Sequence, residues 1–342
     1  MQSSSTLESR IVRYDDLVPC RNAFVDSRSP GSDAKENFTI IGPGVSENPN
    51  QHVHVPEAHG FNIGGARQPP RCLNSQHSHE TAEVFVVHSG EWRFMFGVKG
   101  DDADVRLAPG DTISIPTRMF RGFENVGEES GFLFAVLGGD DPGKVTWAPQ
   151  VFALAEQYGL VLLKGGRLVD TSVGELVPDD AVYEQPPGPE EIAELLTPDA
   201  DKMAGCVARF AELKANPDSA LAKSATVGVS EAAVITPQAT DDGFNAGPIA
   251  AWWPHGFNLR QLTLLAGARV AQHRRAEAEV FFVQQGELHV SLDGLGETVL
   301  GVGDTLTVPI ATARSFKNTS SDDCLLFVVR GSDNPQPPEF SS

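Results

Sequence analysis

The chain has 342 residues, of which 40% are hydrophobic and 21% charged, so it holds enough apolar material for two folded domains. Its formal net charge of −20 argues against a nucleic-acid surface, because phosphate binding requires a basic stripe. No apolar run approaches the roughly 18 residues of a transmembrane helix, and the first residues lack the pattern of a secretory signal. The four cysteines form no CxxC pair, which fits a reducing compartment. We therefore expect a cytoplasmic protein without membrane or nucleic-acid partners.

The chain begins with a segment of unclear pattern and continues as β structure. Residues 1–45 are expected to form an N-terminal arm that packs against a domain. Residues 46–146 follow as a first domain, in which two apolar runs within residues 83–97 are broken at Ser89-Gly90 and predict a β-hairpin. The segments DTISIP (111–116) and GFLFAVL (131–137) have the β-branched and aromatic residues of strands. This domain is predicted to be all-β.

Residues 147–225 differ in pattern and predict a partly helical, proline-rich linker. Residues 147–163 place apolar residues three and four apart, which is typical of a helix. Residues 189–217 begin with proline and two glutamates, which helix N-termini prefer. Residues 175–189 are rich in proline, and we place the connector between the two domains there.

The remaining residues, 226–342, repeat the first β domain. The motif HGFN at 59–62 returns at 255–258, an offset of 196, and the motif GDT at 110–112 returns at 303–305, an offset of 193. The offset falls by three because one loop of the second copy is three residues shorter than its counterpart in the first. Internal repeats of this length indicate two tandem copies of one domain.

Both copies resemble the cupin superfamily. In the first copy His77, His79, Glu83 and Gly90 follow the spacing of the first cupin motif, and Gly110, Pro116 and Asn125 follow that of the second. The second copy matches at His273, Glu279, Gly286, Gly303, Pro309 and Asn318. The resemblance implies a bicupin, which is an all-β protein made of two tandem double-stranded β-helix (jelly-roll) barrels. The motif departs from the family at Arg121, where a third histidine ligand is usual.

His77, His79 and Glu83 are the candidate metal ligands. Residues two apart on a strand point to the same face, and the turn after His79 can return the Glu83 carboxylate to that face. Two imidazoles and one carboxylate form the facial triad of non-haem iron(II) oxygenases, although manganese, nickel, cobalt or zinc remain open. The alternative is a binding cavity in which these side chains hold no metal.

Arg121 has two possible roles. Its guanidinium can reach past the ligands and bind a substrate carboxylate bidentately, which would make it a catalytic and substrate-binding residue. It can instead pair with Glu83 and inactivate the site. His59, which opens the repeated HGFN motif, is a further candidate for substrate binding in the same cavity.

The second copy carries a degenerate site made of His273, Arg275, Glu279 and Arg314. Arginine has no lone pair for a metal, and its permanent charge repels one. We expect a metal-free domain in which Glu279 pairs with an arginine. An anion pocket built from Arg275 and Arg314 is the alternative.

The layout resembles that of gentisate-type ring-cleaving dioxygenases, which use metal in the first barrel only. This resemblance implies one divalent metal, with iron(II) as the first expectation, and a dioxygenase acting on a small organic acid or phenolic compound. A metal-dependent isomerase, lyase or decarboxylase with the same ligands is an alternative. A non-catalytic small-molecule-binding bicupin is another. A homodimer is an expectation from the family.

Overall fold

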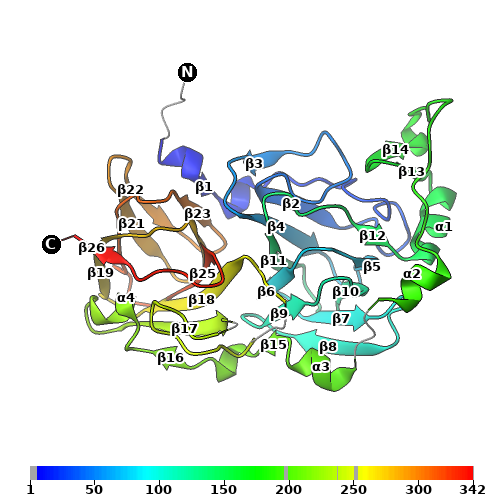
Figure 1. Ribbon diagram of the computed structural model, residues 1–342. Helices are drawn as coiled ribbons and strands as arrows, with labels where there is room; N and C mark the ends of the chain where they lie inside the picture. The colour runs from blue at the N-terminus through cyan, green and yellow to red at the C-terminus, as the bar shows by residue number, and fades with distance from the viewer. Residues whose placement is uncertain (1–5, 196–198, 237, 250–252, 342) are drawn as a thin grey trace. The chain divides into compact units, whose positions relative to one another are not determined.

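The computed structural model describes residues 6–195, 199–236, 238–249 and 253–341 (Figure 1). The chain divides into two compact units. One, here called the first barrel, comprises residues 18–56 and 62–207; the other, the second barrel, comprises residues 1–17, 57–61 and 208–342. The first barrel is therefore built from two segments of the chain and the second barrel from three. No helix within these described ranges has the length and apolarity needed to cross a membrane.

The first barrel contains two sheets (Figure 1). The seven-stranded sheet has the order β15 (Val207–Ala208), β9 (Thr112–Ile115), β6 (Glu83–Ser89), β11 (Gly131–Gly138), β4 (Phe61–Gln68), β2 (Glu36–Ile41) and β3 (Val53–Val55). The five-stranded sheet has the order β12 (Thr146–Trp147), β5 (Leu73–Ser78), β10 (Arg121–Asn125), β7 (Trp92–Phe96) and β8 (Ala103–Leu107). Apart from the parallel pair β2–β3, the strand registers of these sheets are antiparallel.

The second barrel repeats this arrangement. Its seven-stranded sheet has the order β1 (Ile11–Val12), β23 (Thr305–Val308), β20 (Glu279–Gln285), β25 (Cys324–Gly331), β18 (Phe257–Leu264), β17 (Val229–Ile235) and β16 (Ala215–Asn216). Its five-stranded sheet has the order β22 (Gly296–Leu300), β21 (Leu288–Leu292), β24 (Arg314–Lys317), β19 (Arg269–Arg274) and β26 (Glu339–Phe340). The all-β fold of two tandem double-stranded β-helix barrels, expected from the cupin resemblance, is confirmed.

The expected strands form, but the expected hairpin within residues 83–97 does not. β6 and β7 lie in different sheets, and β6 pairs with β9 and β11 while β7 pairs with β8 and β10. Gly90, with a positive φ of 83°, turns the chain from one sheet to the other. A Cβ on Gly90 would lie 2.7 Å from the Cα of Gly131, so the close approach of the two segments also requires glycine there. Two apolar runs across a glycine do not distinguish a hairpin from such a corner.

The expected linker is only partly helical. Residues 147–163 begin as α1 (Pro149–Gln157), but Gly159 has a φ of 83° and the chain continues as the hairpin of β13 (Leu160–Leu163) and β14 (Arg167–Asp170). Residues 189–217 hold the short helices α2 (Pro189–Ala193) and α3 (Ala200–Ala204), and residues 196–198 of this prediction lie outside the described part of the chain. Short helical turns complete the set of elements: η1 (Glu8–Arg10), η2 (Tyr14–Asp16), η3 (Thr171–Val173), η4 (Phe210–Glu212) and α4 (Ala220–Lys223).

Residues 1–45 are not a single arm. β1 adds to the edge of the second barrel by pairing with β23, with Ile11 opposite Leu306. β2 instead pairs with β4 inside the seven-stranded sheet of the first barrel. The expected domain ranges thus differ from the observed units. Each barrel includes a short N-terminal segment whose apolar residues show no periodic pattern. Sequence periodicity therefore does not reveal which barrel the segment joins.

Candidate metal centre

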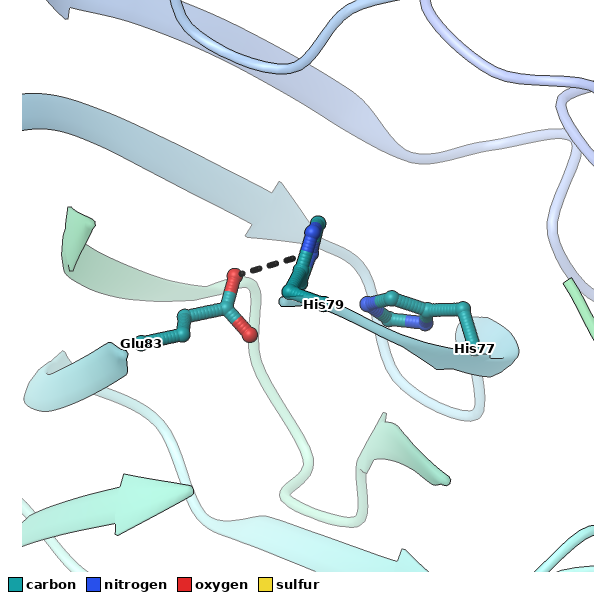
Figure 2. Close-up of side chains that lie close together, drawn as sticks. All are labelled: His77, His79 and Glu83. Atoms are coloured by element: carbon teal, nitrogen blue, oxygen red, sulfur yellow. Dashed lines mark ion pairs between the residues drawn. The ribbon is translucent and has the colours of Figure 1, made fainter. Parts of the chain in front are cut away.

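His77, His79 and Glu83 lie together in the interior of the first barrel (Figure 2). His77 stands on β5, His79 follows one residue after β5 ends, and Glu83 is the first residue of β6. One ligand atom from each side chain lies within 4.8 Å of the other two, and all three residues are buried. The structure therefore brings together the three residues that the sequence predicts as ligands.

The hydrogen bonds of His77 leave its Nε2 as the atom that can coordinate an ion. Nδ1 lies 2.7 Å from the backbone oxygen of Ser75. Because a carbonyl oxygen only accepts, this contact places the proton on Nδ1 and the lone pair on Nε2. A backbone partner of this kind fixes the tautomer and the ring orientation of a metal-ligating histidine.

Glu83 is held by Arg121. Nε and Nη2 of Arg121 both donate to Oε2 of Glu83, the former at 3.1 Å, and Nη1 donates to the backbone oxygen of His77 at 3.2 Å. The other carboxylate oxygen, Oε1, lies 3.6 Å from Nε2 of His79. One oxygen of Glu83 is therefore used by the arginine, and the other remains on the side of the two histidines.

The predicted role of Arg121 as a substrate anchor is not supported by this arrangement. Its guanidinium is almost fully buried, and its donors are directed to Glu83 and to a backbone oxygen. Arg121 is also absent from the residues that line the cavity next to the ligands. The physical reason is that the carboxylate of Glu83, on β6 of the other sheet, is within reach of Arg121 without any substrate.

Burial sets the protonation of the site. It lowers the pKa of both His77 and His79 well below the ordinary value, and the charge of Arg121 lowers them further. Both imidazoles are therefore neutral, which is the form that binds metals. Burial raises the pKa of the Glu83 carboxyl, and the Arg121 guanidinium opposes this rise.

The donor set fits a divalent metal ion. Nitrogen and oxygen ligands about 2.0–2.2 Å from a common ion lie about 3 Å from one another when they occupy one face of its coordination sphere. The three ligand atoms all lie within 4.8 Å of one another, and rotations of the side chains would bring them to that spacing. His77 Nε2, His79 Nε2 and Glu83 Oε1 would hold the ion, and the remaining positions would be open to a small molecule.

A cavity lies next to these ligands and offers about 70 Å³ to the centre of a water molecule. Its wall is mostly apolar and includes the aromatic side chains of Phe85, Phe123 and Trp147. This volume is well below the roughly 300–1,000 Å³ of pockets that hold drug-sized ligands, so the cavity suits a small guest. A large phenolic compound would require the walls to move.

His59 does not enter this cavity. It belongs to the segment 57–61 of the second barrel, and its Nε2 contacts the hydroxyl of Thr307 on β23. Nδ1 lies 2.7 Å from the backbone oxygen of Glu57. The prediction that His59 binds substrate beside the ligands is therefore not supported by its position, because the HGFN segment is exchanged into the other unit.

The equivalent positions of the second barrel hold a buried cluster of charges. Glu279 lies 3.3 Å from Nε of Arg275 and 3.4 Å from Nε of Arg314, and it accepts a hydrogen bond of 2.7 Å from Nε of Arg330. Burial lowers the pKa of His273 to about 4, so its imidazole is neutral. The arginines lower the pKa of Glu279 to about 2 against the effect of burial, so its carboxylate is ionised. As the sequence predicts, Glu279 pairs with arginines.

Arg330 and Arg260 are members of this cluster that the motif comparison does not identify. The offsets of 193 and 196 place Arg330 opposite Leu137 and Arg260 opposite Gly64, and both of these residues line the cavity of the first barrel. Arg330 also donates to Glu231 at 2.8 Å. The signal in the sequence is an arginine inside an apolar strand where the first copy has a small or apolar residue.

Two further sets of buried residues surround His77. Lys35 pairs with Asp26 and donates to the amide oxygen of Asn74 at 2.8 Å. Glu47 accepts hydrogen bonds from the backbone of Val25 at 2.7 Å and from the indole of Trp147 at 2.6 Å. The ring of Trp147 packs 5.2 Å from the ring of His77. These residues lie outside the motifs, so the sequence gives no signal for them.

The comparisons with known proteins agree with this fold. Residues 66–137 and 261–330 each match the family described as the cupin domain. A search of curated protein sequences finds no significant match. The two matched segments contain most of the paired strands of the two barrels and all the candidate ligands of the first.

Solved structures of similar fold include oxalate decarboxylases. The formate complex of the Lactobacillus farciminis enzyme aligns with a TM-score of 0.60 at 12% identity, over 98% of this chain and 89% of that one. A deletion mutant of the Bacillus subtilis enzyme aligns with a TM-score of 0.57 at 12% identity, over 95% of this chain and 78% of that one. At this identity the likeness concerns the fold alone.

Proposed function

The chain is a bicupin of the cupin superfamily, and from this premise we propose that its first barrel is the metal site of a decarboxylase acting on a small carboxylic acid. The observation that carries the proposal is the convergence of His77, His79 and Glu83 on one point at the wall of a cavity. The equivalent point of the second barrel is occupied by arginines. Catalysis is therefore assigned to the first barrel.

The charges around the first cavity favour an anionic substrate. Arg121 balances Glu83, Lys35 balances Asp26, and both imidazoles are neutral. Burial raises the pKa of Glu47 to about 8, so this carboxyl is mostly protonated at neutral pH. A divalent ion would thus bring two positive charges that the protein does not compensate. A carboxylate substrate supplies the missing negative charge inside a low-dielectric interior, where the attraction is strong.

Size and wall composition support a short substrate. The space beside the ligands suits a small molecule, and its apolar walls exclude bulk water from the bound carboxylate. The solved structures of similar fold are named oxalate decarboxylases, and one is a formate complex. Short carboxylic acids, with oxalate as the first to test, are therefore the substrate class that we propose.

The roles of the residues follow from their contacts. When bound, a divalent cation supplies Lewis acidity toward a coordinated carboxylate. His77 and His79 present neutral nitrogens, with the orientation of His77 fixed by Ser75. Arg121 orients the Glu83 carboxylate through two hydrogen bonds, and its charge opposes the rise of the Glu83 pKa that burial causes. Decarboxylation breaks one carbon–carbon bond, releases CO₂ and places a proton on the remaining carbon, with no external oxidant.

A dioxygenase is the second candidate, and one observation favours it. Two histidines and one carboxylate with open positions are the donor set of non-haem iron(II) oxygenases. The two activities differ in their use of oxygen. A dioxygenase consumes one O₂ per substrate, whereas a decarboxylase consumes none in its balanced reaction.

The test uses the full chain reconstituted separately with Mn²⁺ and Fe²⁺. Oxalate, malonate and a simple phenolic acid are supplied, and CO₂ release and O₂ consumption are followed together. We expect CO₂ release from a short carboxylate without stoichiometric O₂ consumption, and loss of this activity in His79→Ala. His52→Ala, an exposed histidine of the same barrel, is the matched control that keeps activity. O₂ consumption in proportion to product would support the dioxygenase, and no turnover with either metal would contradict both candidates.

A further inference from the structure

We propose that the second barrel binds a compact anion, a small carboxylate such as formate or a halide, between Arg275 and Arg314. The site would lie where the first barrel places its candidate metal ligands, since Arg275 repeats His79 and Arg314 repeats Arg121. The two barrels would then hold guests of opposite charge at equivalent positions. This inference does not depend on the proposed decarboxylase activity.

First, several buried N–H donors of Arg275 and Arg314 make no hydrogen bond. All three nitrogens of Arg314 are buried without a hydrogen bond, and so are Nε and Nη2 of Arg275. Nη1 of Arg275 is the exception and donates to the backbone oxygen of Gln336 at 3.0 Å. Both side chains are almost completely buried, with 0% exposure for Arg314 and 2% for Arg275. The two Nε atoms face Glu279 at 3.3 and 3.4 Å without forming hydrogen bonds, so it is chiefly the Nη groups that lack acceptors, and a buried charged donor without an acceptor is costly.

The second argument is the balance between donors and acceptors. Within the described part of the cluster, the acceptors without a hydrogen bond are single oxygens of Glu279, Asp242 and Glu277 and Nε2 of His273, four atoms that are fewer than the eight N–H groups on the non-bonded nitrogens of Arg275 and Arg314. Arg330 and Arg260 also retain one unpaired nitrogen each. A water molecule brings as many donors as acceptors, whereas an anion brings acceptors only. An anion therefore corrects the excess of donors better than water does.

The third argument is charge. Arg260, Arg275, Arg314 and Arg330 face three fully buried carboxylates, those of Glu231, Asp242 and Glu279. The imidazole of His273 is neutral, and Glu277 at the edge of the cluster is only partly buried. The fully buried groups alone thus carry one more positive than negative charge, which favours an anion over a cation among them, and Glu277 offsets this excess from the edge of the cluster, where its charge acts on Arg314. The complete burial of both arginines restricts the guest to a compact ion.

Thermal unfolding of the full chain in formate, chloride and gluconate at matched ionic strength tests the site. Gluconate is too large to enter and serves as the reference anion. We expect formate or chloride to raise the unfolding midpoint saturably, by at least about 2 °C. Arg314→Met should lose this increase. Arg274→Met removes the same charge from an exposed position on the neighbouring strand, β19, and should keep the increase. An anion effect arising in the first barrel would persist in Arg314→Met.

A bromide-soaked crystal of the unaltered protein provides the second measurement, which does not depend on the stability of a variant. We expect an anomalous scattering peak within hydrogen-bond distance of Arg275 and Arg314. Water alone at this position, together with unfolding midpoints equal in all three anions, would overturn the proposal. A stronger effect of formate than of chloride would identify a carboxylate as the preferred guest, and the reverse order a halide.

Discussion

Arg121 and Glu83 form a buried pair in which the guanidinium engages one carboxylate oxygen and leaves the other beside His79. The pair does not block the candidate metal site, because the oxygen it uses is not the one that faces the histidines. It instead holds the carboxylate in place. In the second barrel the same pairing is extended by two more arginines on Glu279, and both oxygens of that carboxylate face guanidinium groups.

His77→Ala should abolish metal binding by the chain. Removing one of three protein ligands from a site without other donors should weaken affinity by more than about 100-fold, since even the loss of an outer-shell partner costs 10–100-fold. Metal content after dialysis against dilute Mn²⁺ or Fe²⁺ measures the effect. His273→Ala is the matched control from the second barrel and should leave metal content unchanged. Equal metal content in both variants would place the ion elsewhere.

Arg121→Gln should destabilise the folded chain. Breaking a buried ion pair by removing one partner leaves an uncompensated charge and costs about 3–5 kcal/mol of unfolding free energy. Denaturant unfolding in the presence of a chelator measures this loss without a contribution from metal. The double variant Arg121→Gln/Glu83→Gln removes both charges, so it should be less destabilised than the sum of the two single variants. Strict additivity would show that the two side chains do not interact.

Leu137→Arg should give the first barrel a glutamate paired with a further arginine, as in the second barrel, and so prevent metal binding. Leu137 lies opposite Glu83 in the β6–β11 register, as Arg330 lies opposite Glu279 in the β20–β25 register. A new guanidinium there would pair with the oxygen of Glu83 that faces His79, and metal binding should fall by more than about 100-fold. Leu137→Met conserves the volume and should retain the metal. Titration calorimetry with Mn²⁺ compares the two variants.

Glu47 should make the stability of the chain depend on pH. Burial raises its folded pKa to about 8 from an ordinary value of 4.5. The folded chain therefore binds this proton more tightly than the unfolded chain. The contribution of Glu47 is complete below about pH 4.5 and is lost as the pH rises to about 8, for a total of a few kcal/mol. Denaturant unfolding at several pH values should show a smaller decrease for Glu47→Gln than for the unaltered chain.

The control for this experiment is Glu156→Gln, which changes an exposed carboxylate on α1. It should follow the unaltered chain at every pH. Parallel curves for Glu47→Gln and the unaltered chain would mean that the Glu47 carboxyl is ionised in the folded state, because its two hydrogen-bond donors outweigh burial.

The ligand triad could be predicted from sequence because it depends on local geometry. His77 lies on β5 and His79 directly after its end, two residues on, and a short turn brings Glu83 at the start of β6 to the same point. The partner of Arg121 could not be predicted, because a long side chain reaches either the carboxylate or a substrate from the same backbone position. Which of the two Arg121 reaches depends on the strand register that places it opposite His77, and this register is known only from the structure.

The assignment of chain segments to the two barrels also could not be predicted from the sequence. The HGFN motif repeats at the correct offset, yet residues 57–61 belong to the second barrel, and this changes the neighbour of His59 to Thr307. Arg330 lies in a strand whose other residues are almost all apolar, so the alternation that normally marks an inward position is absent there, and Arg260 lies in a strand that mixes polar and apolar residues. Comparison of the two copies position by position recovers them.

The account depends most directly on where a metal ion binds. Anomalous diffraction from a crystal of the full chain soaked in Mn²⁺ measures this position. The account predicts one peak per chain, bounded by His77, His79 and Glu83, and no peak beside Glu279. Absence of a peak in the first barrel, or a peak among the arginines of the second, would contradict it.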